Sequence, residues 1–178
     1  MNIFALDTDP AVAAKMHCDK HVCKMVIEYA QLMSTAHRML DGELYNAKTA
    51  SNRNIKRWRL EDEREALLYK ASHINHPSAI WVRETDSNYL WMYELFRELC
   101  SEYTYRYNRT HLTEKKLLRV LRTPPEGIRR GSLSTIPLAM PDYCKLSDTV
   151  ESYRNYYIKE KKSFVNWKKR EIPYWFSF

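Results

Sequence analysis

The residues with the greatest capacity for chemistry lie near the start of the chain, in the stretch MHCDKHVCKMVIE at positions 16–28. It holds histidines, cysteines and a glutamate, which are residue types that serve as metal ligands, nucleophiles and acid–base groups. A helix turns about 100° per residue, so side chains three, four and seven positions apart lie on one face. On a helix the polar side chains therefore form one stripe, which comprises His17, His21, Lys24, Glu28, Gln31 and Thr35.

Apolar residues flank this polar stripe on both sides, whereas a simple surface helix places its charges opposite the core. We therefore expect Glu28 to be partly buried, where a carboxylate needs a cationic or hydrogen-bonding partner. Lys24 lies one turn before Glu28 and His21 lies two turns before it, so either residue is a candidate partner. Two interpretations remain open at this point: a structural network of polar groups, or a catalytic or ligand-binding face.

A metal site and a cysteine nucleophile are weaker interpretations of the same stretch. His17 and His21 have the spacing to share a zinc ion, but no second Cys-x-x-Cys pair completes a tetrahedral site. Cys23 falls on a different arc from His21, which disfavours a Cys–His catalytic pair. The four cysteines show no disulfide framework and are expected to be buried, reduced thiols. We predict neither a metal nor a cofactor.

The net charge of +7 and the pI near 9.2 indicate a polyanionic partner. Lysines and arginines alternate with aromatic and apolar residues in four segments, a pattern that suits phosphate contacts and base stacking. These segments are NIKRWR (54–59), EKKLLRVLR (114–122), GIRRG (127–131) and the C-terminal KEKKSFVNWKKREIPYWFSF (159–178). Nucleic acid is the predicted partner.

The composition predicts one all-α domain over residues 1–178. Apolar residues make up 44% of the chain, enough for a hydrophobic core, and there are three glycines and no long alternating strand pattern. No leader pattern is present, and no apolar run approaches the roughly 20 residues that a membrane helix needs. We therefore expect a cytoplasmic protein that does not enter a membrane.

Capping residues and apolar periodicity predict where the helices lie. We expect a short helix after Asp9-Pro10 and a second one that is capped by Asp19 and ends at Asp41-Gly42. The other expected elements are a loop over 42–51, helical structure over 57–72, a short helix entered through His76-Pro77, a long helix from Ser87 to Tyr107, a basic helix over 113–122, an irregular connection over 123–146, and a last helix over 147–162.

Several motifs resemble the pyrimidine-dimer DNA glycosylases of the phage endonuclease V type and their broader phage and bacterial relatives. The match covers roughly residues 1–40, where His21 precedes Glu28 by seven positions in HVCKMVIE. The wider pattern D-K-x-x-x-K-x-x-x-E is also present, as DKHVCKMVIE over residues 19–28. NHPSAIW at 75–81 and the aromatic C-terminal segment extend the resemblance in patches. The resemblance implies a small, basic, helical enzyme whose catalytic glutamate lies close to the N-terminal amine.

The resemblance also implies a role for each candidate residue. Glu28 would stabilise the positive charge that develops on the deoxyribose when the base leaves. The amine of Met1 would attack the sugar C1′, with Lys24 as its substitute, because an α-amine has a reference pKa of about 7.7–8.0. His21 would contact a phosphate or the sugar. Further candidates for substrate binding are His17, Gln31, Asn75, His76, Trp81, Arg129 and Arg130.

Two departures from the phage enzymes concern the amine nucleophile and the substrate. Asn2 follows Met1 where the phage enzyme has a small residue, and Ile27 and Gln31 occupy the places of two arginines beside the glutamate. We therefore predict action on a damaged or modified pyrimidine in DNA rather than on pyrimidine dimers specifically, with or without cleavage of the strand. A non-catalytic nucleic-acid-binding protein is the main alternative, and a metal-dependent nuclease or hydrolase is the third.

Overall fold

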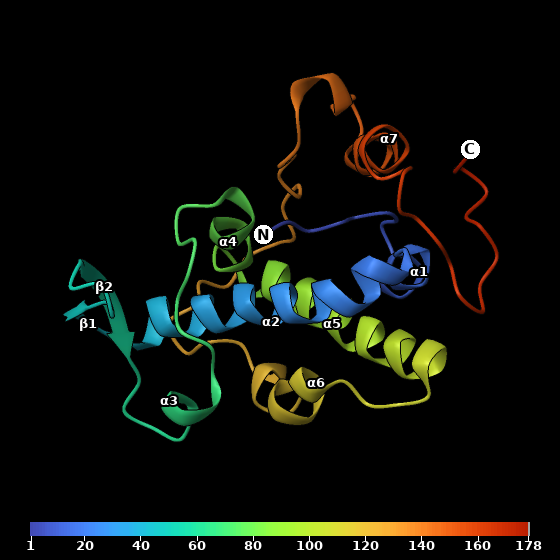
Figure 1. Ribbon diagram of the computed structural model, residues 1–178. Coiled ribbons are helices and arrows are strands. Elements are labelled where there is room, and N and C mark those ends of the chain that lie inside the picture. Colours follow the sequence, from blue (N-terminus) through green and yellow to red (C-terminus); the bar gives the residue numbers. More distant parts are fainter. Residues whose placement is uncertain (178) are drawn as a thin grey trace.

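The computed structural model describes residues 1–177 and shows a mostly helical protein with a small two-stranded antiparallel sheet (Figure 1). The helical prediction is confirmed in its main feature, but the chain is not strictly all-α. The elements in chain order are α1 (Pro10–Met16), α2 (Asp19–Asp41), β1 (Glu43–Lys48), β2 (Asn54–Arg59), α3 (Arg64–Leu67), α4 (Pro77–Val82), α5 (Asp86–Tyr107), α6 (Leu112–Leu117), the short 3₁₀ helices η1 (Val120–Arg122) and η2 (Asp142–Cys144), and α7 (Thr149–Glu160).

The long helices α2 and α5 form the centre of the molecule, and α1 packs on α5 beside them (Figure 1). Their buried side chains belong to one hydrophobic cluster, to which α7 contributes Tyr153 and Tyr157. The predicted inner face of α5 is confirmed, since Met92, Phe96 and Leu99 are fully buried. No helix within residues 1–177 is long and apolar enough to span a bilayer.

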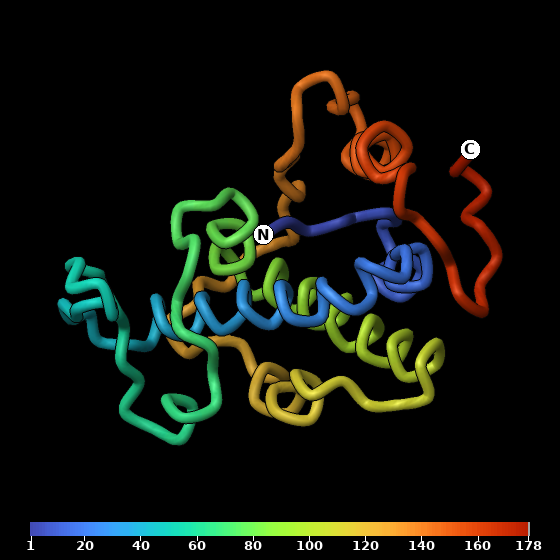
Figure 2. The backbone as a smooth tube through the Cα atoms, viewed as in Figure 1, coloured from blue at the N-terminus to red at the C-terminus, as the bar shows by residue number. Residues whose placement is uncertain are grey.

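The first six residues form an extended segment that runs between α2 and α7 (Figure 2). Residues 3–6 of this N-terminal segment are buried in the main hydrophobic cluster. The backbone N–H of Phe4 donates to the hydroxyl of Tyr29 on α2, and Arg154 on α7 donates to the carbonyl of Leu6 at 2.9 Å. The start of the chain is therefore held from both sides.

Most of the predicted helix caps are confirmed, with one correction on α2. Asp9 caps α1 and Asp148 caps α7, each through a side-chain bond to a backbone N–H. The N-cap of α2 is Cys18, so the prediction that Asp19 caps this helix is wrong. Asp19 instead pairs with Arg106 of α5 and accepts the backbone N–H of Lys168.

The region between α2 and α4 corrects two predictions. Residues 43–48 of the expected loop over 42–51 form strand β1. Within the expected helix over 57–72, only α3 is helical: residues 57–59 belong to β2, and the remaining residues are turns and irregular chain. The strands pair in register from Glu43 opposite Arg59 to Lys48 opposite Asn54. Asn52 adopts a left-handed conformation (φ 59°) in the connection between them, which lets the chain reverse.

Arg38, fully buried near the end of α2, fixes the chain that follows this hairpin. Its guanidinium donates to the backbone carbonyls of Trp58, Tyr69 and Leu68 at 2.9, 2.7 and 3.0 Å. Farther along, Thr35 exchanges hydrogen bonds with the backbone of Ser72. These bonds bring residues 58–72 onto α2 and set the entry to α4.

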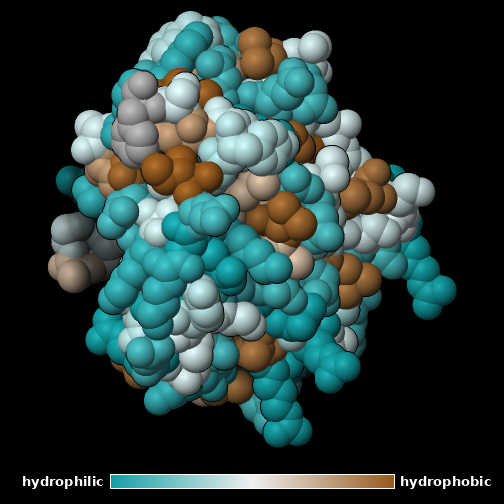
Figure 3. Space-filling view, turned by 90° about the vertical axis from the view of Figure 1, so that its right-hand side faces the viewer, coloured by the Kyte–Doolittle hydropathy of each residue, from teal (hydrophilic) through white to brown (hydrophobic). Residues whose placement is uncertain are grey.

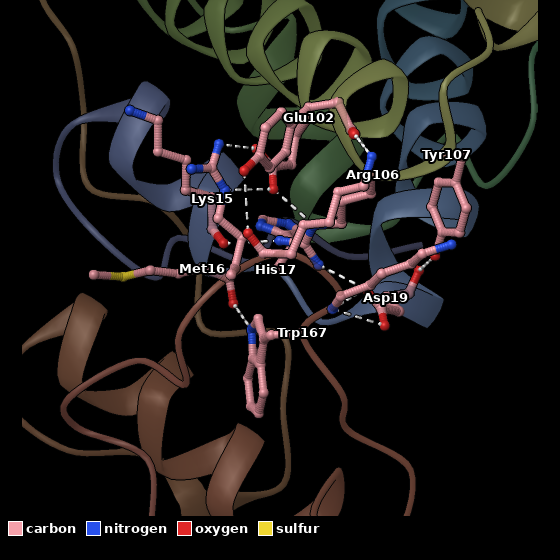
Figure 4. A network of polar contacts seen from close by, with 12 residues as sticks. Lys15, Met16, His17, Asp19, Glu102, Arg106, Tyr107 and Trp167 are labelled. Atoms are coloured by element: carbon pink, nitrogen blue, oxygen red, sulfur yellow. Dashed lines mark hydrogen bonds and ion pairs between the residues drawn. The ribbon is translucent and has the colours of Figure 1, made fainter.

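A second buried arginine connects α1, α2 and α5. Figure 4 shows Arg106 surrounded by acceptors, where it donates to Glu102, to Asp19 and to the backbone carbonyl of Lys15 at 2.6, 2.8 and 2.9 Å. Trp167 from the C-terminal segment adds a bond from its indole N–H to the carbonyl of Met16. This network fixes the turn between α1 and α2. The predicted polar stripe is corrected at its first member, because His17 is the C-cap of α1 and the other members lie on α2.

Candidate active site

The terminal amine of Met1 and two side chains of α2 meet at one place. The amine nitrogen of Met1 lies 3.8 Å from Oε2 of Glu28, and Nζ of Lys24 lies 3.1 Å from Oε1. The Glu28 side chain is 14% exposed and that of Lys24 is 68% exposed, so the carboxylate sits at the edge of the interior. One carboxylate thus lies between two amines, and one of the amines belongs to a residue 27 positions earlier in the chain.

Asn2 fixes the position of that amine. Its side-chain NH₂ donates to the carbonyl of Ala139 at 2.9 Å, and its Oδ1 accepts the backbone N–H of Ile3 at 2.8 Å. The hydroxyl of Tyr153 on α7 lies 3.1 Å from the same Oδ1. Asn2 therefore anchors the terminus in this chain.

His17 lies behind the N-terminal segment and is part of a defined chain of hydrogen bonds. Its Nδ1 donates to the carbonyl of Ala13, and its Nε2 accepts the hydroxyl hydrogen of Tyr29, both at 2.7 Å. Tyr29 in turn accepts the N–H of Phe4. Burial lowers the pKa of His17 to about 4, so the ring is neutral at pH 7. Both of its nitrogens are already occupied by protein groups.

His21 is also enclosed, which corrects the direct phosphate or sugar contact that we expected of it. Its Nδ1 is hydrogen bonded to the Tyr157 hydroxyl, and its ring stacks on Phe4 with centroids 4.3 Å apart. Burial, followed by the charges of neighbouring cationic groups, lowers the pKa of His21 to about 2. In this arrangement His21 supports the N-terminal segment instead of facing solvent.

His76, one of the candidates for substrate binding, is the N-cap of α4. Its Nδ1 accepts the backbone N–H of Ser78 at 3.2 Å, so a neutral ring carries its proton on Nε2. Burial lowers the pKa of His76, the Met1 amine and His73 lower it further, and Glu28 opposes them. This neutral imidazole is therefore an electrostatic neighbour of the amine and of the carboxylate.

His73 belongs to the same neighbourhood and was not anticipated from the sequence. Its backbone has φ 51°, a left-handed conformation that costs energy for a residue other than glycine. Its carbonyl accepts the N–H of His76 at 2.8 Å and closes the turn before α4. The sequence HINHP contains two histidines and could have drawn attention to this position, but the spacing of the histidines alone does not identify a turn.

The other predicted substrate-binding residues have separate positions. Gln31 is partly buried and Asn75 is exposed, and neither side chain makes a hydrogen bond within residues 1–177. Trp81 is buried, donates from its indole to the carbonyl of Ser134 and packs edge-on against Trp91, so this candidate for substrate binding is enclosed in the interior.

Arg129 and Arg130 are exposed on the connection that precedes η2. The backbone carbonyl of Arg129 accepts the N–H of Asp86 at the start of α5, which anchors this part of the connection. Neither guanidinium forms an ion pair with the described residues, and neither contacts Met1 or Glu28. They remain candidates for phosphate contacts outside the immediate centre.

Cationic and aromatic side chains border the N-terminal segment on the side of α7. Nζ of Lys161 lies 4.3 Å from the centroid of the Tyr156 ring, and Tyr156 stacks on Phe4 at 6.0 Å. Lys20 lies over the Phe164 ring at 4.6 Å. Rings and ammonium groups therefore alternate along the N-terminal segment near Phe4. Unstacked bases and their phosphates bind to surfaces of this kind.

Two further hollows lie away from this centre. One has a volume of about 810 Å³ and is bordered by His37, Arg64, Lys116 and Arg119, among others. The other, of about 420 Å³, includes Tyr93 and Glu114. Over residues 1–177 no group of three histidine, cysteine or acidic side chains comes together as a metal site. The Met1–Glu28 pair is distinguished by its chemical groups and not by a large cavity.

Comparison with protein-family models, with curated proteins and with solved structures finds no match to this chain.

Proposed function

We propose that this protein is a DNA N-glycosylase that acts on a damaged or modified pyrimidine and then cleaves the strand as a lyase. The observation that carries the proposal is the 3.8 Å separation between the Met1 amine and Glu28 Oε2. An amine and a carboxylate at this separation are the two groups that amine-dependent removal of a base requires. The resemblance of residues 19–28 to the endonuclease V type of glycosylase supports the same reaction.

The reaction begins when the neutral amine forms a bond to C1′ of the deoxyribose. The bond from C1′ to the base breaks, and the base leaves with the electron pair and takes up a proton. Positive charge develops on the sugar in the transition state, and the carboxylate of Glu28 stabilises it. Enclosure at the edge of the interior strengthens that interaction, because the local dielectric is lower than that of water.

The amine adduct then loses a proton and the sugar ring opens to give a Schiff base between the protein and C1′. Removal of a proton from C2′ expels the 3′ phosphate and breaks the strand by β-elimination. Met1 is the preferred nucleophile because α-amines as a class are partly neutral near pH 8, whereas lysine side chains have a reference pKa of about 10.4. Lys24 is then a mostly exposed cationic neighbour of the carboxylate.

The base must leave the helical stack to reach this centre. The alternating rings and ammonium groups beside the N-terminal segment, which include Tyr156, Phe164, Lys20 and Lys161, supply surfaces for the displaced nucleotides. The face that carries α1 and the C-terminal segment is mostly hydrophilic, with hydrophobic side chains scattered across it (Figure 3). The excess of positive charge supports binding of the DNA backbone.

A panel of duplexes that each contain one damaged or modified pyrimidine tests the proposal. The wild-type protein should release the base from at least one duplex and break the strand at that site. A protein with two glycines added before Met1 should bind the same duplex but fail to break it, because the extension moves the amine away from Glu28. Strand cleavage that survives the extension would contradict the role of the Met1 amine, and DNA binding without any base release would favour a non-catalytic protein.

A further inference from the structure

The β1–β2 hairpin extends from the end of α2 and projects from the helical body (Figures 1 and 2). Gly42 joins it to α2, and a Cβ at this position would lie 2.5 Å from the carbonyl oxygen of Arg38 and 3.0 Å from that of Arg59. A larger residue would not fit there without a shift of the backbone. Arg38 also donates to the carbonyl of Trp58 in β2, so the base of the hairpin is held in one orientation.

The register gives the hairpin two different faces, because cross-strand partners point to the same side of a sheet. One face is partly buried toward the body, where Tyr45, Ala47 and Ile55 lie and Arg57 donates to the carbonyl of Ala71. The other face is open, and toward the tip it is entirely polar. Its members, in cross-strand pairs, are Leu44 with Trp58, Asn46 with Lys56, and Lys48 with Asn54.

The charges of the hairpin are mostly positive, and ion pairs with the described residues do not neutralise them. Residues 43–59 contain five lysines and arginines and a single acid, Glu43, at the base. No side chain of this range forms an ion pair with any residue that the structure describes, and Arg59 instead lies over the Tyr45 ring at 4.9 Å. The amides and ammonium groups of the open face therefore retain their full hydrogen-bonding capacity.

We propose that this hairpin enters the major groove of duplex DNA beside the reacting nucleotide. The inference rests on DNA as the partner in the proposed function and adds to it the surface that holds the duplex. A two-stranded ribbon fits the width of the major groove, asparagine amides pair with base edges, and lysines pair with phosphates or guanine. Lys48 and Lys56 supply the charge, and Asn46 and Asn54 lie beside them on the same face.

The placement also predicts where on the duplex the contact falls. The hairpin follows the end of α2, and α2 continues without a break for 13 residues from Glu28 to Asp41. At 1.5 Å per residue this separation is about 20 Å along the helix. That length corresponds to about six base pairs at 3.4 Å each, so the contact lies to one side of the reacting nucleotide.

The double variant Lys48→Ser/Lys56→Ser tests the inference against a short undamaged duplex. We expect binding to weaken at least tenfold at low salt, and the slope of log affinity against log salt to fall by about two, one for each lost phosphate contact. The matched control Lys15→Ser/Lys145→Ser removes the same charge from α1 and from the connection before α7. It should weaken binding much less. Equal binding by the hairpin variant and the wild type would overturn the inference.

The amide pair is tested separately with Asn46→Ala/Asn54→Ala, which leaves the charge unchanged. The slope of log affinity against log salt should stay at the wild-type value. The differences in affinity among duplexes of different sequence should become smaller. Unchanged melting temperatures show that each variant is folded. Base release by the wild type is measured in parallel on modified duplexes. If the lysine variant binds DNA more weakly but the wild type releases no base, the hairpin contact is supported and the glycosylase function is rejected. If the wild type releases base but the lysine variant binds DNA as well as the wild type, the glycosylase function is supported and the hairpin contact is rejected.

Discussion

Glu28→Gln is expected to fold like the wild-type protein and to release base at least about 100-fold more slowly. Glutamine keeps the shape of the side chain but removes the negative charge that faces the developing sugar cation. The loss should appear in the rate of the single-turnover reaction and not in affinity for DNA, because the charge acts mainly in the transition state. Base release under single-turnover conditions is the measurement.

Lys24→Gln is the matched control for that variant, since it removes the other charge of the Lys24–Glu28 pair. Its side chain is mostly exposed, and an exposed ion pair one turn apart contributes about 0.3–0.5 kcal/mol. We therefore expect it to retain most of the activity. Base release by Glu28→Gln at the wild-type rate would show that Glu28 is a structural residue, as the alternative interpretation of the polar stripe holds.

Arg106→Met is expected to lower the free energy of unfolding by about 3–5 kcal/mol, the largest effect on stability that we predict. The Arg106 side chain is 0% exposed and contacts Glu102, whose side chain is 3% exposed. Burial works to raise the pKa of Glu102, but hydrogen bonds from Arg170 and Arg106 outweigh it and hold the pKa below its usual value. Without Arg106 this carboxylate keeps Arg170 as its one cationic partner within residues 1–177.

Arg97→Met on the same helix is the control for this substitution. Arg97 pairs with Glu94 and Glu98, but its side chain is 47% exposed, so its loss should cost less than about 1 kcal/mol. Urea or thermal unfolding of both variants measures the difference. A similar small loss in both would show that the network in Figure 4 contributes little to stability.

The parts of the fold that local sequence predicts are the capped, strongly amphipathic helices. Asp9 and Asp148 identify the starts of α1 and α7, and the apolar spacing of residues 92–103 identifies the inner face of α5. The hairpin was not predicted because residues 42–51 were expected to form a loop and residues 57–72 have helical spacing. Long-range hydrogen bonds from Arg38 to the backbone of residues 58–69 favour the strand, and a local sequence pattern cannot predict such bonds.

In the candidate site, too, local sequence predicts the contacts within one helix and misses the contacts that depend on long-range packing. Helical spacing correctly placed Lys24 beside a partly buried Glu28, since both lie on one helix. The approach of Met1 follows from the burial of residues 3–6 and from the anchoring of Asn2, which depend on packing against α7. His21 was assigned to the substrate because its position on the stripe does not reveal that Phe4 and Tyr157 enclose it.

Reduction with borohydride tests the central claim most directly, because it converts a Schiff base between protein and DNA into a stable secondary amine. The wild-type protein is incubated with a duplex that it cleaves, the adduct is digested, and the modified residue is identified by peptide mapping. The account predicts a covalent adduct on the α-amine of Met1, with little or none in Glu28→Gln. An adduct on Lys24, or release of the base with no adduct at all, would contradict it.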